Sequence, residues 1–262
     1  MPACDRSKGI DTRSRSIWNE RTVAWYRRAN ERSDYAEKFL GAIPDLLACS
    51  RNALDMGAGF GALVLPLARL MERVTGVEPS PAMAAALRDA VACARLDNVT
   101  VIEAAWGDVS AKPHDLVVCA HVSNLLQPGS SFLTALARGD LAQRGVALVR
   151  DAPGVEDKFF FSELYPILLG RPYAKSCASD ETVEELARVG VKPTLTPIEY
   201  SSDQPFDSLE EACDFWMEYM GLSSGEHRAY LRGFLASRLR RDNGEWVAPF
   251  RKRAIVVHWA VK

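Results

Sequence analysis

The sequence predicts an α/β fold built on a doubly wound, mostly parallel sheet. Between residues 51 and 152, short apolar segments alternate with segments of helical periodicity. That order is typical of parallel strands joined by right-handed helical crossovers, with helices on both faces of the sheet. A glycine-rich turn follows the first apolar segment, and a nearly uninterrupted apolar segment ends the chain.

Length, charge and cysteine usage set the outer bounds. With 262 residues and 48% hydrophobic content, the chain can bury a full core, and we expect one domain over 16–262 behind a disordered tail at 1–15. The formal net charge of −2 gives no general attraction to nucleic acid or to an anionic membrane. The six cysteines form no Cys-x-x-Cys pair, and no apolar run reaches membrane-spanning length. We therefore expect a cytoplasmic protein without a metal site or a membrane partner.

An N-terminal helical cap is expected over residues 16–50. From Trp18 onward, apolar residues recur at spacings of four and three, which predicts an amphipathic helix over 17–32. A capping-box pattern that begins at Asp34 predicts a second short helix from Tyr35.

Five strands are expected over residues 51–152. Their predicted bounds are 53–56, 74–78, 99–105, 115–121 and 146–151, with helices at 60–70, 81–94 and 131–137. Beyond residue 152 the alternation stops, and we assign 153–250 to an insertion with helices and 251–262 to the last strand. The expected elements there are a helix at 181–189, a strand at 194–200, a helix capped by Ser208, a helix capped by Ser223 that runs to about residue 241, a turn at Asn243-Gly244 and a strand at 254–261.

The turn after the first strand is the strongest functional signal. Residues 54–61 read Leu-Asp-Met-Gly-Ala-Gly-Phe-Gly, so an acid, Asp55, precedes Gly57, Gly59 and Gly61. Without Cβ atoms, a ligand can lie against this backbone, including Ala58, and the following helix would point free N–H groups at it. The pattern predicts binding of a nucleotide-like molecule; the alternative is a glycine-rich turn without a ligand.

The arrangement Asp-x-Gly-x-Gly-x-Gly resembles motif I of the class I S-adenosylmethionine-dependent methyltransferases. The dinucleotide pattern Gly-x-Gly-x-x-Gly fits less well, because the third glycine comes one place early. The resemblance covers residues 51–151 well and the C-terminal half in outline. It implies a seven-stranded sheet with an antiparallel last strand, and S-adenosyl-L-methionine as the cofactor.

The resemblance also implies roles for residues at the strand ends. Glu78, followed by Pro79, would accept the ribose hydroxyls, as it would in an NAD enzyme. Asp108 would bond the adenine amino group, with Gly107 and Trp106 beside the ring. Asp55 would face the methionine end, together with the backbone of Cys119 and Ala120. A turn aspartate and a strand-end acid are the plain alternatives for Asp108 and Glu78.

Two residues are candidates for a general base. His121 ends the fourth strand and has an ordinary pKa near neutrality, and Asp151 ends the fifth. A packed histidine bonded to backbone is the alternative for His121. Because the sulfonium is already activated, alignment in a dry pocket matters more than either residue.

Aromatic and apolar residues outside the sheet are expected to wall the acceptor pocket, with core packing as their alternative role. They are Tyr26, Tyr35, Phe160, Tyr165, Trp216, Tyr219 and Met220.

We interpret the chain as a methyltransferase for an oxygen or nitrogen of a small molecule, as a monomer or homodimer. Its fourth strand is followed neither by Asn/Asp-Pro-Pro-Tyr nor by Pro-Cys, the motifs of DNA-modifying relatives. The basic clusters at 238–241 and 251–253 are expected to be solvated faces. Three alternatives remain open: a methyltransferase acting on RNA or protein, an NAD-dependent oxidoreductase, and a non-catalytic scaffold.

Overall fold

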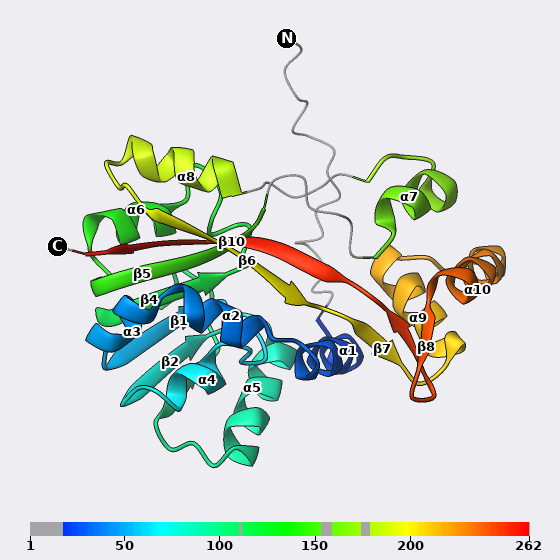
Figure 1. Cartoon of the computed structure of the whole chain (residues 1–262), viewed down its shortest axis with the longest axis horizontal. Helices are drawn as coiled ribbons and strands as arrows, with labels where there is room; N and C mark the ends of the chain where they lie inside the picture. Colours follow the sequence, from blue (N-terminus) through cyan, green and yellow to red (C-terminus); the bar gives the residue numbers. More distant parts are fainter. Residues whose placement is uncertain (1–17, 110–111, 153–158, 174–178, 262) are drawn as a thin grey trace, which may run out of the picture.

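A seven-stranded sheet with helices on both faces forms the larger of two lobes (Figure 1). The computed structural model describes residues 18–109, 112–152, 159–173 and 179–261, so the tail expected at 1–15 lies outside it. The strands of this sheet are β1 (Asn52–Met56), β2 (Arg73–Val77), β3 (Val99–Ile102), β4 (His114–Ala120), β5 (Ala142–Asp151), β6 (Thr194–Ser201) and β10 (Arg251–Ala260). Their order is β3-β2-β1-β4-β5-β10-β6, and β10 alone among them runs antiparallel to its neighbours. The predicted fold class is confirmed.

Alternate residues of the central strands enter two separate cores. On β4, Leu116 and Val118 pack on the face covered by α2 (Tyr35–Ala42), α3 (Pro44–Cys49), α4 (Val64–Ala68) and α5 (Pro81–Cys93). Val117 and Cys119 pack on the opposite face, under α6 (Ser131–Arg138) and α8 (Ser179–Arg188). Burial on both faces explains why these strands read as continuous apolar runs.

The smaller lobe has a core rich in aromatic rings. It contains α7 (Phe161–Leu169), α9 (Leu209–Met220), α10 (Gly225–Arg238) and a three-stranded sheet of β7 (Gln204–Phe206), β9 (Glu245–Ala248) and β8 (Arg240–Asp242), in that order. Phe206, Phe215 and Trp216 are fully buried at its centre, with ring centroids 5.0–5.6 Å apart. The chain passes from the larger lobe into the smaller one between β6 and β7, and it returns between β9 and β10.

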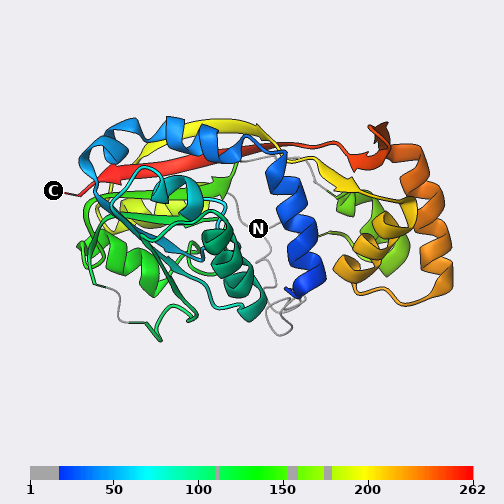
Figure 2. The same ribbon diagram turned by 90° about the horizontal axis from the view of Figure 1, so that it is seen from below.

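Helix α1 (Glu20–Glu31) lies between the two lobes (Figure 2). Its Val23 packs on Met83 of α5 in the larger lobe. On its other side, Trp25 Nε1 donates to Glu211 Oε1 of α9 at 2.9 Å, and Arg28 forms an ion pair with the same carboxylate. The helix is therefore part of both lobes.

Several elements differ from those that the sequence predicts. The helix expected at 60–70 is only α4, because Gly59 and Gly61 adopt positive φ and the chain is still turning there. Ser224 rather than Ser223 caps α10, accepting from His227 N, and the helix ends at Arg238. The next residues pair instead with β9 across the Asn243-Gly244 turn, whose φ values are +48° and +88°. The short strands β7, β8 and β9 were not predicted. Within the described ranges, no helix is both long and apolar enough to cross a membrane.

We expect Trp216→Ala to destabilise the protein by about 3–5 kcal/mol, because it empties a fully buried indole site. Urea unfolding measures this change. Tyr230→Ala is the matched control, since this side chain is exposed and should cost less than about 0.5 kcal/mol. Equal effects of the two substitutions would contradict the packing described here.

Candidate active site

Glycines at the end of β1 allow the chain to turn tightly against neighbouring elements. Gly57 and Gly61 have φ values of +80° and +97°, which side chains rarely adopt. A Cβ on Gly57 would lie 2.3 Å from Val122 Cγ2, and one on Gly61 would lie 2.5 Å from Leu87 Cδ1. The N–H groups of Gly57 and Ala58 both donate to the carbonyl of Val77, at 2.8 and 3.0 Å, which fastens the turn to the end of β2.

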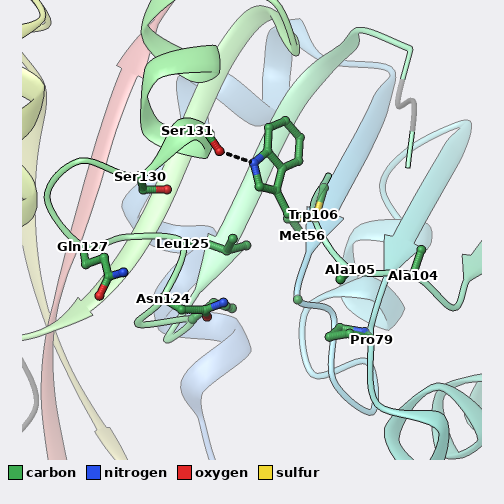
Figure 3. Close-up of a pocket in the computed structure, with 12 residues that line it drawn as sticks. Met56, Pro79, Ala104, Ala105, Trp106, Asn124, Leu125, Gln127, Ser130 and Ser131 are labelled. Carbon is green, nitrogen blue, oxygen red and sulfur yellow. Dashed lines mark hydrogen bonds between the residues drawn. The ribbon is translucent and has the colours of Figure 1, made fainter. Parts of the chain in front are cut away.

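A cavity of about 400 Å³ lies beside this turn, where β1, β2 and β4 end (Figure 3). It is lined by Met56, Gly57, Pro79, Ala104, Ala105, Trp106, Val122, Asn124, Leu125, Gln127, Ser130 and Ser131. The Trp106 ring is held in place, because its Nε1 donates to Ser131 Oγ at 2.9 Å and its edge meets Phe132 with centroids 5.1 Å apart. Clefts of this size with a few polar groups are typical ligand sites.

The structure brings some of the predicted cofactor residues together and leaves others apart. Gly57, Pro79 and Trp106 line the cavity, whereas Asp108 is exposed and does not. Gly107, with a φ of +101°, belongs to the same turn as Asp108. Cys119 is fully buried in the core under α6, and Ala120 ends β4. Polar groups that sequence reasoning missed, Asn124, Gln127 and Ser130, come from the loop after β4; the only signal for them is its polar composition.

Glu78 binds the protein's own backbone with both carboxylate oxygens. Oε2 accepts from Gly59 N and Oε1 from Ser80 N, each at 2.8 Å, so the side chain joins the glycine turn to the start of α5. Burial raises the pKa of Glu78, and the two N–H donors partly oppose that rise. Each carboxylate oxygen has a second lone pair, so the predicted ribose contact is compatible with these bonds.

Asp55 is a buried carboxyl with no hydrogen-bond partner for its side chain among the described residues. It is 2% exposed. Burial, and then the charge of Glu78, raise its pKa to about 7. A buried carboxylate without a partner is costly, so this group either keeps its proton or meets a cation.

The two candidate bases, His121 and Asp151, lie close together, and His121 directly precedes Val122, which lines the cavity. His121 Nδ1 is 3.3 Å from Asp151 Oδ1, and its Nε2 is 3.1 Å from Tyr200 Oη. Lys252 Nζ lies 2.9 Å from the same oxygen of Asp151. Burial and the charge of Lys252 lower the pKa of His121 to about 4. Burial alone would raise the pKa of Asp151, but His121 and Lys252 outweigh it and lower that pKa.

The predicted pocket walls divide into two groups. Tyr26 and Tyr219 share a hydrogen bond between their hydroxyls at 2.6 Å, and Tyr35 packs on Tyr200 with centroids 4.7 Å apart. The other candidates belong to the smaller lobe: Phe160 stacks on Trp216, Tyr165 packs against Phe161, and Trp216 and Met220 are in its core. Trp216 Nε1 donates to the carbonyl of Phe159 at 2.7 Å, which satisfies its polar atom internally.

Comparisons with known proteins agree with this geometry. Residues 53–139 match the family model for a methyltransferase domain. The fold is similar to the YcgJ protein of Bacillus subtilis, with a TM-score of 0.52 and 16% identity over 86% of this chain and 99% of that one. It is also similar to a SAM-dependent methyltransferase of Aquifex aeolicus, with a TM-score of 0.51 and 16% identity over 68% of this chain and 90% of that one. No curated protein sequence matches the chain significantly.

Residues 53–139 therefore match a methyltransferase domain, and the strand order of the sheet is that of the class I methyltransferase fold that the glycine motif predicts. Within the described ranges, no three His, Cys, Asp or Glu side chains come together as a metal site.

We expect Asp55→Asn to stabilise the free protein at pH 8 by roughly 2–4 kcal/mol, and to have little effect below pH 4. The folded protein holds the Asp55 proton up to a pKa of about 7, against 3.8 for an ordinary aspartate. The unfolded chain thus loses this proton first, and stability falls as the pH rises between those values. Urea unfolding across this range measures the difference, and the exposed Asp89→Asn should show no such gain. A gain independent of pH would contradict the burial of an uncompensated carboxyl.

Proposed function

We propose that this protein transfers a methyl group from S-adenosylmethionine to an oxygen or nitrogen of a small molecule. The observation that carries this proposal is the cavity beside Gly57, where the missing Cβ leaves backbone as one wall and the fixed Trp106 ring forms another. A planar base fits beside an indole, and a ligand can lie directly on the turn.

The residues present suit this cofactor at both of its ends. Trp106 and Pro79 would hold the adenine end, with Gln127 and Ser130 as polar contacts. Glu78 has lone pairs left for the ribose, and Asp55 offers a buried negative charge for the methionyl ammonium. When bound, S-adenosylmethionine supplies a methyl group on an activated sulfonium. We also propose that residues 16–50 and 153–250 cover the acceptor side.

The charge distribution favours a small acceptor over RNA or an acidic protein. Arg238 pairs with Glu163, Arg240 with Asp203, and Arg251 with Glu199. Arg241 lies over the ring of Trp246, at 4.8 Å. Because these clusters are neutralised by acids of the same chain, they offer little attraction to a phosphate backbone. Both His121 and Asp151 are also largely covered, which suits a small molecule better than a polymer.

We expect the wild-type protein to bind S-adenosylhomocysteine, and not NADH, in isothermal titration. Gly57→Ala should weaken that binding by roughly 30-fold or more, because its Cβ would displace Val122 from the cavity wall. Gly190→Ala is the matched control: its φ of +84° is equally strained, but nothing lies within 4 Å of the new Cβ. Binding of NADH alone, or equal losses in both variants, would contradict the proposal.

Binding of S-adenosylhomocysteine near pH 6.5 should release ~0.5–0.75 proton per ligand, because a nearby ammonium lowers the pKa of Asp55 from about 7. Titrations in phosphate and in Tris measure this release, since the apparent enthalpy then depends on the heat of buffer ionisation. Asp55→Asn should abolish the difference between buffers. A difference that persists in this variant would place the released proton elsewhere.

A further inference from the structure

The cluster around His121 contains a polar group that its surroundings leave unsatisfied. Tyr35 Oη is buried and has no hydrogen-bond partner among the described residues. Its ring packs against those of His121 and Tyr200, with centroids 5.8 and 4.7 Å away. Burial raises the pKa of the Tyr35 hydroxyl most, and Tyr200 and the charges of Asp55 and Asp151 raise it further. The hydroxyl is therefore within the electrostatic field of both acids. A buried hydroxyl of this kind is expected to have a partner, and the hydroxyl of a bound molecule would supply one.

The contacts of His121 indicate where its proton resides. Asp151 is an acceptor only, and its Oδ1 lies 3.3 Å from Nδ1 without an aligned hydrogen bond, so its charge favours the neutral tautomer with the N–H at Nδ1. Nε2 then holds a lone pair and accepts the proton of the Tyr200 hydroxyl, 3.1 Å away. With its hydrogen directed at His121, Tyr200 Oη keeps free lone pairs for another donor.

The cluster is connected to the cavity through the turn after β4. His121 directly follows β4, and the next residue, Val122, lines the cavity and touches Gly57. His121 has a φ of +58°, which is costly for a residue with a side chain and is common at functional sites. The turn sends Val122 toward the cavity and lets the imidazole reach Tyr200 and Asp151.

We infer that Tyr200, His121 and Asp151 form a proton relay for an acceptor with a neutral hydroxyl group, and that Tyr35 Oη is the second contact of that hydroxyl. This inference rests on the proposed function. As the acceptor oxygen bonds to the methyl carbon and the carbon–sulfur electron pair leaves with sulfur, the hydroxyl proton passes to Tyr200 Oη. Tyr200 passes its own proton to His121 Nε2, and the imidazolium that forms is held by Asp151 until it loses the proton to water.

The charges around His121 match this acceptor. The groups that face it are Asp151 and Arg150 from β5, Lys252 from β10, Tyr200 from β6 and Tyr35 from α2. Together with burial, Lys252 lowers the pKa of His121, which makes it a weak base. A weak base is sufficient for an oxygen that has gained a methyl group, because that oxygen becomes a far stronger acid than imidazolium. A strongly basic alkyl amine would keep its proton instead.

Histidine-selective NMR of the free protein tests the relay. The four histidines make assignment tractable, and the ¹⁵N shifts should show the Nδ1–H tautomer for His121. Lys252→Met should raise the titration midpoint of His121 by about one pH unit or more, and Tyr200→Phe should raise it by a smaller amount. Each substitution removes an interaction that favours the neutral imidazole. His258, whose Nε2 lies 3.0 Å from Thr196 Oγ1, is the internal control and should not move. Tyr230→Phe and Lys192→Met are the matched surface variants.

The acceptor contact is tested with phenol as the hydroxyl probe, in the presence of S-adenosylhomocysteine. Phenol should shift the His121 Nε2 resonance, and Tyr35→Phe and Tyr200→Phe should each weaken its binding at least threefold, whereas benzoate should leave the resonance in place. Affinity for S-adenosylhomocysteine should stay within twofold in both variants. The relay would be overturned if His121 carried its proton at Nε2, or if its titration midpoint were ordinary and unchanged by Lys252→Met. It would also be overturned if benzoate, but not phenol, shifted the Nε2 resonance. Absence of S-adenosylhomocysteine binding in the wild type would instead overturn the proposed function, and the tautomer would still be measured.

Discussion

The carboxylate of Glu78 joins the two parts of the chain that shape the cavity. It accepts from Gly59 in the turn after β1 and from Ser80 at the start of α5, each at 2.8 Å. The bonds of Gly57 and Ala58 to Val77 hold the start of this turn, and Glu78 adds the link from Gly59 to α5. The same negative charge raises the pKa of Asp55, and the loop geometry and the electrostatics of the site therefore depend on one side chain.

The parallel half of the fold could be predicted from the sequence, whereas the polar contacts of the site could not. Short apolar segments separated by helices leave few arrangements for a sheet, and the strands of the larger lobe lie within a few residues of their predicted bounds. Asp55 and His121 were picked out by position and residue type. Their partners were not, because His121 meets Tyr200 across 79 positions of sequence and Tyr35 comes from a separate helix. Nothing in the sequence indicated that both carboxylate oxygens of Glu78 would accept hydrogen bonds from backbone N–H groups of the protein.

The smaller lobe shows why aromatic residues were hard to assign. From the sequence, Trp216 and Met220 are expected to wall the acceptor pocket, with core packing as their alternative role. The structure places them in a core of their own, together with β7 and β9, two strands too short to be recognised from their sequence. Two other predicted wall residues come from the N-terminal helices: Tyr26 bonds to Tyr219, and Tyr35 packs against His121.

The double strand crossing between the lobes restricts how a substrate can enter. Where β6 continues into β7 and β9 into β10, Ser202 N donates to the carbonyl of Phe250, and Phe250 N donates to Asp203 Oδ1, both at 2.8 Å. We expect two segments linked in this way to bend together, and the ion pair of Arg28 with Glu211 of α9 opposes the same motion. The smaller lobe is therefore restrained against swinging open as a flap on a single hinge, which limits this route of substrate entry.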